Sequence, residues 1–223
     1  NTRSLYGSFL VVRVKSVNGW LRTWGTFPRE RLRVNNRGGL EVSMRHVVYS
    51  VAMSLDGHIA GPRGESDWII IDPEIDFNAM FARFDTILMG RKTYETTRTS
   101  QGGSMPGVES YVFSRMLRQA DCRGVTVSDD PSQTVSALKE QSGKDIWLFG
   151  GGVLFGSLLE LGLVDRVSVA IIPALLGGGV PLLPDVQRQT QLRLLEHQLY
   201  AKTGTLTLEY AVTQKQRRAK QRS

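Results

Sequence analysis

The sequence has very little cysteine and no long apolar run. Cys122 is its only cysteine, so no internal disulfide can form, and we expect a reducing, cytoplasmic compartment. No stretch approaches the roughly 18 consecutive apolar residues that a membrane-spanning helix requires. With one cysteine and three histidines, the sequence also lacks any His/Cys cluster with zinc-ligand spacing. We therefore expect neither a membrane partner nor a metal ion.

Acidic residues are scarce at the two ends of the chain, so the net charge of +7 comes from these ends and not from the middle. Residues 1–43 contain eight Lys/Arg and two Asp/Glu, and residues 215–223 contain five Lys/Arg and no acid. Residues 44–214 carry 15 basic and 19 acidic side chains. A nucleic-acid-binding domain normally carries its basic surface on the folded module itself. We therefore expect no nucleic-acid partner, and we interpret residues 214–223 as a disordered basic tail.

The first 43 residues show no sustained period of 2 or 3.6, and glycine, proline and an Asn-Asn-Arg-Gly-Gly run interrupt them. Ser8 to Val17 could form a strand, but the segment lacks the basic, apolar, small-residue order of a secretory signal. We expect residues 1–43 to be an extension that is disordered or non-native. One domain over residues 44–213 is then expected, beginning at Met44.

From Met44 onward the pattern becomes regular. β-rich runs bounded by turn residues predict strands over residues 46–54, 86–89, 110–113, 125–127, 146–149 and 164–172. Apolar spacing and capping residues predict helices over residues 73–84, 92–99, 131–141 and 153–161. Residues 192–200 and 205–212 predict a terminal hairpin. Strands that alternate with helices and end in a hairpin indicate an α/β fold with a mainly parallel, mixed sheet.

The helix expected over residues 73–84 has the most explicit signals. Asp72 is a good N-cap, and Pro73 suits the first helical position. One apolar face is then formed by aromatic residues and a methionine spaced three or four apart, namely Phe77, Met80, Phe81 and Phe84.

Three predicted strands end in residues suited to binding phosphate. They are followed by Gly90-Arg91-Lys92-Thr93, by Ser114-Arg115 and by the triplet Gly150-Gly151-Gly152. Glycine lets a backbone approach a ligand closely, and the amides and dipole at a helix N-terminus favour anions. A glycine triplet alone is equally typical of a tight turn. Three such junctions at strand ends predict a ligand with several phosphates, one of them beside Ser114 and Arg115.

Four segments also resemble a known family in their order and spacing. They are Ser54-Leu55-Asp56-Gly57-His58-Ile59-Ala60, Met89-Gly90-Arg91-Lys92-Thr93-Tyr94-Glu95, Phe149–Gly152 with Leu161–Arg166, and Ile172–Leu182. Together they resemble the dihydrofolate-reductase-like superfamily, closest to the C-terminal reductase domain of bacterial riboflavin-biosynthesis deaminase-reductases. The resemblance covers Met44 to about Val212. It implies a dihydrofolate-reductase-like three-layer fold with helices on both faces of the sheet, and an oxidoreductase that uses NADPH.

The resemblance also implies which residues bind the cofactor. The phosphates, the 2′-phosphate and the nicotinamide side would be held by Ala52, Ile59, Ala60, Gly90, Arg91, Lys92, Thr93, Ser114, Arg115, Gly150, Gly151, Gly152 and Val153. Asp56-Gly57 would begin a mobile loop over the nicotinamide pocket, although the same pair is equally typical of a turn. Gly177–Gly179 is expected to shape a bend rather than to contact the cofactor.

A proton donor is the least defined part of the expected site. Folate-reducing enzymes resemble one another in a helix where a carboxylate directly precedes an apolar residue, and Asp76-Phe77 could supply this pair. Asp76 is thus the catalytic candidate, with Asp72 and Glu74 as rivals. Asp76 in a first helical turn is also explained as a charge that favours the helix dipole.

The expected function is therefore an NADPH-dependent reductase of a small heterocyclic or ribosylated substrate, either a pterin such as dihydrofolate or a pyrimidine of the riboflavin pathway. Because zinc-ligand spacing is lacking, we do not expect these residues to form the deaminase half of the riboflavin enzymes. The alternative is a non-catalytic nucleotide-binding module with the same fold. A homodimer is left open.

Overall fold

The computed structural model describes residues 45–101, 107–184 and 189–213, together with short strands between residues 9 and 42. Those strands are β1 (Phe9–Val11), β2 (Lys15–Ser16), β3 (Gly19–Trp20), β4 (Thr26–Pro28), β5 (Leu32–Val34) and β6 (Leu40–Val42). Among the described strands, they pair only with one another, as β1 with β4, β2 with β3 and β5 with β6. The expectations for the rest of residues 1–43 and for the tail 214–223 lie outside the described residues.

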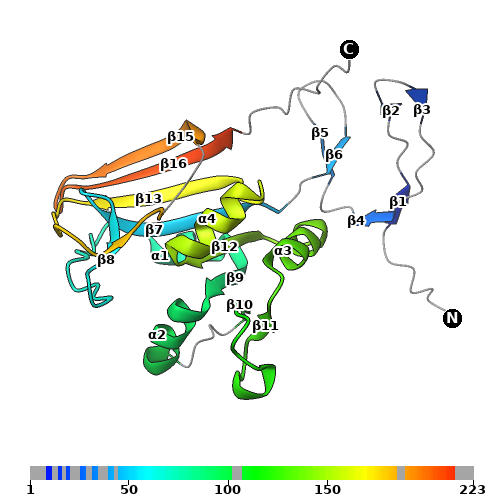
Figure 1. The fold of residues 1–223 in the computed structure, drawn as a ribbon. Helices are drawn as coiled ribbons and strands as arrows, with labels where there is room; N and C mark the ends of the chain where they lie inside the picture. Colours follow the sequence, from blue (N-terminus) through cyan, green and yellow to red (C-terminus); the bar gives the residue numbers. More distant parts are fainter. Residues whose placement is uncertain are drawn as a thin grey trace, which may run out of the picture.

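An eight-stranded mixed sheet forms the centre of the domain (Figure 1). Its spatial order is β11 (Thr126–Ser128), β10 (Glu109–Phe113), β9 (Phe84–Gly90), β12 (Asp145–Gly150), β7 (Val47–Ser54), β13 (Arg166–Ile172), β16 (Thr205–Thr213) and β15 (Gln191–Tyr200). The first six strands run parallel, and β16 runs antiparallel to both of its neighbours. The predicted α/β class with a mainly parallel sheet and a C-terminal hairpin is confirmed.

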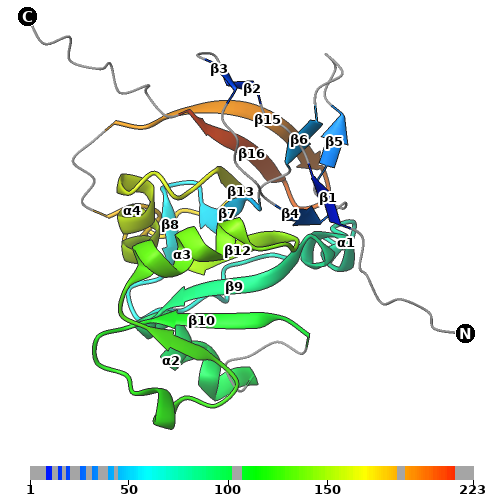
Figure 2. The same ribbon diagram turned by 90° about the vertical axis from the view of Figure 1, so that its right-hand side faces the viewer.

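Helices cover both faces of this sheet, as predicted. They are α1 (Phe77–Ala82), α2 (Arg91–Gln101), α3 (Pro131–Glu140) and α4 (Gly152–Glu160). Val47 and Tyr49 pack with residues of α3 and α4, whereas Val48 between them packs on the side of α2. This alternation follows from the period of two in a strand. Figure 2 shows α2 and α3 on opposite sides of β9 and β10. Within the described part of the chain, no helix is long and apolar enough to span a membrane.

The other predicted strands and helices of residues 45–213 begin and end within two residues of the observed ones, but the helix expected over residues 73–84 is wrong in extent. It begins only after Asp76, whose side chain accepts a hydrogen bond from the Ala79 amide, and it ends at Ala82. Phe84 belongs to β9 instead. Asp72 is fully buried and accepts hydrogen bonds from the Glu74 amide at 2.9 Å and the Thr203 hydroxyl at 2.9 Å. Asp72 therefore does not cap a helix, as the local pattern predicted. Its side chain is hydrogen-bonded to Thr203, a residue distant in sequence.

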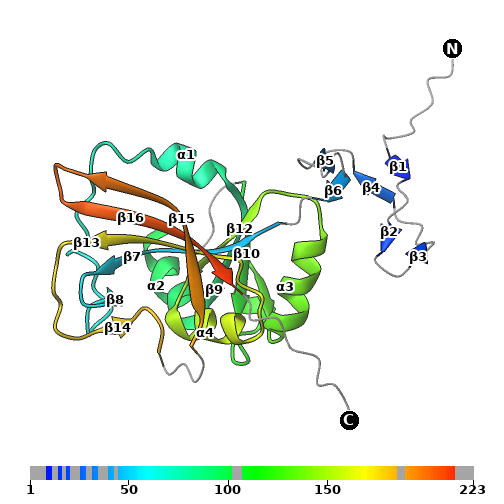
Figure 3. The ribbon, with the colours of Figure 1, turned by 90° about the horizontal axis from the view of Figure 1, so that it is seen from above.

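Two short strands that the sequence did not predict close one end of the domain. β8 (His58–Ala60) pairs antiparallel with β14 (Val180–Pro181). Figure 3 shows both at the end of the sheet where β7 and β13 finish. Gly179 permits this pairing because its φ is +140°, and a Cβ there would overlap the carbonyl oxygen of Ala60. The expectation that Gly177–Gly179 shapes a bend fits this position.

Candidate functional site

The strand order creates a crevice at the carboxyl ends of β9 and β12. After β9 the chain passes through α2 to β10 on one side, and after β12 it passes through α4 to β13 on the other. Gly150 pairs with Met89, and Phe113 pairs with Gly90, so the three phosphate-type junctions lie at one edge of the sheet. A crevice at the point where strand order reverses is where open α/β sheets bind ligands.

The backbone is open where these junctions meet. A Cβ added to Gly151 would lie 3.6 Å from Thr93 Oγ1, and one added to Gly90 would lie 3.9 Å from the carbonyl oxygen of Gly150. Gly150 itself has a φ of +142°, a backbone conformation that residues other than glycine rarely adopt. The first amides of α2 and of α4 begin at this place, and such amides bind anions.

Cationic and hydroxyl side chains border the same crevice. Lys92 and Arg115 are exposed, and Arg91 is half-buried with its Nη1 3.0 Å from Glu95 Oε1. Ser114 Oγ accepts hydrogen bonds from the amides of Met116 at 3.0 Å and Leu117 at 3.1 Å, so its own hydrogen is available to donate. These groups can bind an anion with charge-assisted hydrogen bonds.

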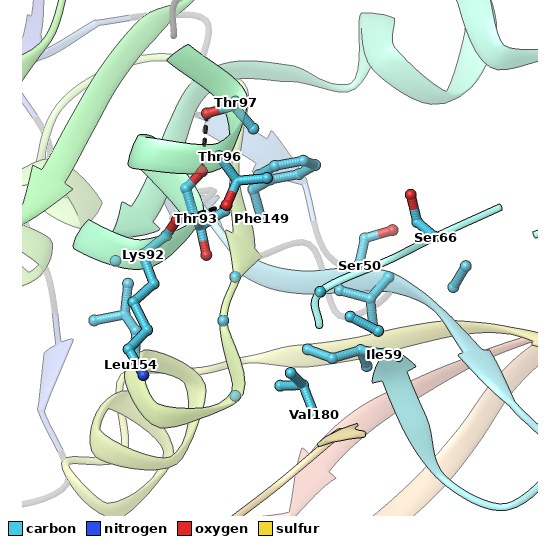
Figure 4. A pocket seen from close by; sticks show the side chains of 18 of the residues that line it. Ser50, Ile59, Ser66, Lys92, Thr93, Thr96, Thr97, Phe149, Leu154 and Val180 are labelled. Carbon is cyan, nitrogen blue, oxygen red and sulfur yellow. Dashed lines mark hydrogen bonds between the residues drawn. The ribbon is translucent and has the colours of Figure 1, made fainter. Parts of the chain in front are cut away.

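The crevice is one half of a cavity of about 1580 Å³, which exceeds the roughly 300–1,000 Å³ typical of a site for one small molecule. Figure 4 shows Lys92, Thr93 and Leu154 on one side and Ser50, Ile59, Ser66 and Val180 on the other. We call the first side the glycine half, formed by residues 90–93, 95–97, 113–115 and 149–154. We call the second side the chamber. It is enclosed by β7, β13, β16 and α1 and by part of the segment before α1, namely Arg63, Gly64, Ser66, Ile69, Ile70, Ile71 and Ile75.

Small and hydroxyl side chains form the floor of the chamber. Ser50 pairs with Ser168 across β7 and β13, and Ala52 pairs with Ala170 in the next row. Thr207 of β16 continues that second row beside Ala170. All five lie on the sheet face of Val48, the face of α1 and α2, because they share its parity across the paired strands. Small residues in these positions leave room for a ligand above the sheet.

Apolar side chains form the walls of the chamber. They come from the segment before α1, from α1 and from β12, namely Ile69, Ile70, Ile71, Ile75, Phe77, Met80, Phe81 and Trp147. The rings of Phe81 and Trp147 lie 5.3 Å apart, and the Trp147 indole donates to the Ser50 carbonyl at 2.9 Å. Among the described residues that line the chamber, the charged side chain is that of Arg63, which is 89% exposed and 3.4 Å from Glu65. The described residues contain no group of three or more ligands that could hold a metal ion.

The structure brings every residue expected to bind the cofactor to the wall of this one cavity. These residues are Ala52, Ile59, Ala60, Gly90, Arg91, Lys92, Thr93, Ser114, Arg115, Gly150, Gly151, Gly152 and Val153. They come from separate strands and loops, and they lie together because the strands pair in parallel. Their roles toward a cofactor remain predictions.

The three candidate carboxylates do not line the cavity. Asp76 is exposed, and its Oδ1 accepts from the Ala79 amide at 2.9 Å, as an N-cap does. Glu74 Oε1 lies 2.8 Å from Lys202 Nζ. The pKa of buried Asp72 is lowered, first by the hydrogen bond from the Glu74 amide, against the effect of its burial. The geometry thus favours the helix-terminal interpretation of Asp76 over the catalytic one.

Asp56 ties the loop after β7 to the segment after β13. Its carboxylate accepts from the Ser54 hydroxyl at 2.6 Å and from the Gly177 amide at 2.7 Å. These hydrogen bonds, that of Ser54 first, hold the pKa of Asp56 well below its usual range. Gly57 has a φ of +86°, which fits the turn interpretation, and the mobility of this loop remains a prediction.

Of the five floor residues, Ala52 was named from the sequence and Ser50, Ser168, Ala170 and Thr207 were missed, although a signal for the floor exists. β7 and β13 both contain the triplet Ser-Val-Ala, at residues 50–52 and 168–170. Two strands with the same small residues at alternating positions leave one face shallow. The pairing of these triplets, which decides that they form one floor, is set by the sheet order.

The chain is similar in sequence to a known domain family and to a bacterial protein. A model of the RibD C-terminal domain family matches residues 45–206. The uncharacterized protein YyaP of Bacillus subtilis is 33% identical over 181 residues, which are 76% of this chain and 96% of YyaP.

Two solved structures share the fold. One is a diaminohydroxyphosphoribosylaminopyrimidine deaminase/5-amino-6-(5-phosphoribosylamino)uracil reductase from Thermotoga maritima, with a TM-score of 0.56, 19% identity and coverage of 76% of this chain and 57% of that one. The other is dihydrofolate reductase from Enterococcus faecalis in complex with NADP(H), with a TM-score of 0.58, 15% identity and coverage of 76% and 97%. The predicted dihydrofolate-reductase-like fold is confirmed.

Proposed function

The chain belongs to the RibD C-terminal domain family, and we propose that it is an NADPH-dependent reductase of a small heterocyclic or ribosylated substrate. The names of the two structural neighbours support the activity, since one is a uracil reductase and the other a dihydrofolate reductase with NADP(H). The observation that carries the proposal is the joining of the glycine half and the chamber in one cavity. A dinucleotide in the first half would reach a substrate in the second.

The residues of the glycine half fit this cofactor. The amides at the starts of α2 and α4 would bind the pyrophosphate, and glycine at positions 150 and 151 keeps the approach open. Ser114 and Arg115 would bind the 2′-phosphate through a hydroxyl and a guanidinium. NADPH, when bound, supplies a hydride from C4 of its nicotinamide ring. Ala52, Ile59 and Ala60 would orient that ring and keep water away from it.

The preference for NADPH over NADH tests the cofactor assignment. Arg115→Ala removes a charge-assisted contact worth roughly 1.5–3 kcal/mol, so we expect NADPH to bind about ten- to a hundredfold more weakly while NADH binding changes little. Isothermal titration calorimetry with both cofactors measures this difference. Arg118→Ala is the matched control, because Arg118 is exposed and does not line the cavity. Equal affinity of the unmodified protein for the two cofactors would contradict the assignment.

The second candidate function is a nucleotide-binding module without catalysis. The position of Asp76 favours it, since the three candidate carboxylates all lie outside the cavity lining. An assay of NADPH oxidation distinguishes the two functions. The absorbance of NADPH is followed in the presence of dihydrofolate and then of the ribosylated pyrimidine. Oxidation that depends on either substrate supports the reductase. Tight NADPH binding without oxidation in the presence of both substrates supports the binding module.

A further inference from the structure

We propose that the outer edge of β15 is the interface of a homodimer, in which β15 pairs antiparallel with β15 of a second copy of this chain. The proposal goes beyond the proposed reductase function, because it concerns an interaction surface, and the residues of β15 are not among those that line the cavity. It gives the homodimer, which the sequence left open, a defined place in the fold.

The two edges of the sheet differ in how they are protected from further strand pairing. At one edge, β11 is three residues long and is followed by Asp129, Asp130 and Pro131, which disfavour the addition of a strand. At the other edge, β15 is ten residues long and contains neither lysine nor proline. Among the described strands it pairs only with β16, and it forms the outer edge in Figure 1. An edge of this length presents a row of N–H and C=O groups that can pair with another strand.

The side chains of β15 are apolar where a second strand would lie. Four leucines have exposed fractions between 40% and 65%, namely Leu192, Leu194, Leu195 and Leu199. Three of them share one face of the hairpin, because they pair with Val212, Tyr210 and Leu206 of β16. Exposed apolar side chains that gather in one place are typical of an interaction surface. Beside a second copy of β15, these leucines would contact one another and lose exposure to water.

The charges of β15 favour a second copy of the same strand as its partner. Arg193 pairs with Ala211 of β16, and a bulge follows it. Glu196 pairs with Glu209, two residues from Ala211, so both charged side chains of β15 lie on one face. A two-fold axis in the middle of the strand, directly after Leu194, would place Arg193 of each copy opposite Glu196 of the other. A two-fold interface must be self-complementary, and opposite charges directly across an antiparallel pair are favourable.

The mass of the full chain in solution tests this interface. Sedimentation velocity over a wide range of protein concentration should show twice the mass of one chain for the unmodified protein. Arg193→Glu places like charges opposite each other on both sides of the axis, so it should weaken the dimer about tenfold or more. Leu194→Lys introduces the charge that is typical of protected edges and should have a similar effect. Leu175→Lys is the matched control, because Leu175 is 74% exposed but lies outside β15.

A second charge reversal separates a lost contact from a lost fold. Arg193→Glu combined with Glu196→Arg restores opposite charges across the axis, so this double variant should dimerise nearly as well as the unmodified protein. Circular dichroism of each variant verifies that it is folded. A monomer at every concentration overturns the proposal. It is also overturned by a dimer that neither Arg193→Glu nor Leu194→Lys weakens, by one that Leu175→Lys weakens equally, or by failure of the second reversal to restore the dimer.

Discussion

At the scale of residues, three carboxylates within five positions have three different partners. Asp72 is buried against Thr203, Glu74 forms an ion pair with Lys202, and Asp76 caps α1. Three carboxylates that are close in sequence thus have three different roles: one is buried and hydrogen-bonded, one forms an ion pair at the surface, and one caps a helix. The sequence shows that carboxylates are present, and the distant partners Lys202 and Thr203 decide what two of them do.

The cap assignment of Asp76 predicts a change in stability rather than in activity. Asp76→Ala should lower the free energy of unfolding by about 1 kcal/mol, because the Ala79 amide loses its acceptor. Asp76→Asn keeps a capping oxygen, so its free energy of unfolding should differ from that of the unmodified protein by only about a few tenths of a kcal/mol. Urea unfolding measures both variants, and NADPH oxidation by both should equal that of the unmodified protein. A hundredfold loss of turnover in Asp76→Asn would restore the catalytic interpretation.

At the scale of elements, α1 is attached to the sheet by an ionic cluster around the buried carboxylate of Glu209. Arg83, at the end of α1, donates to Glu209 Oε2 at 2.9 Å, and Arg166 donates to Glu209 Oε1 at 2.9 Å. Burial alone would raise the pKa of Glu209, but the hydrogen bonds from both arginines hold it below its usual range. This cluster fixes the C-terminal end of the helix that forms one wall of the chamber.

The glycines at the start of α4 lead to a prediction at this scale. A Cβ on Gly152 would lie 2.8 Å from the Pro181 carbonyl oxygen, so Gly152→Ala should lower the midpoint of thermal unfolding by several degrees. A Cβ on Gly151 meets only Thr93 Oγ1 at 3.6 Å, an ordinary contact. Gly151→Ala should therefore leave the midpoint nearly unchanged and weaken NADPH binding about tenfold or more, because the methyl group enters the phosphate crevice. Thermal unfolding and calorimetry distinguish the two variants, and unchanged NADPH affinity in Gly151→Ala would remove this junction from the proposed cofactor site.

At the scale of the whole molecule, the eight-stranded sheet, its two hydrophobic clusters and the cavity lie within residues 45–213. The described strands before residue 43 pair among themselves and add nothing to that sheet. A chain of residues 44–213 should therefore keep the unfolding midpoint and NADPH affinity of the full chain. Circular dichroism on heating and calorimetry measure both quantities. Insoluble protein from this shortened chain would show that the domain boundary is misplaced.

The sequence by itself determined the fold class, the order of the helices and of the strands of the main sheet, and the residues expected in the glycine half. These depend on local patterns: β-rich runs, helical spacing, the N-cap at Asp130 and glycine after strands. Because parallel strands align their carboxyl ends, junctions recognised one at a time must meet at one edge. Local chemistry therefore carried information about a shared site.

The tertiary structure alone decided the chamber and the partners of the carboxylates. Ser50 and Ser168 are 118 residues apart, and they became one floor because β13 pairs with β7 in a register that no local pattern specifies. Asp72 was predicted to cap a helix, but in the structure its buried carboxylate accepts a hydrogen bond from Thr203, in the distant hairpin turn. Contacts between distant segments depend on the order and register of the strands, and these are set by the packing of the whole domain.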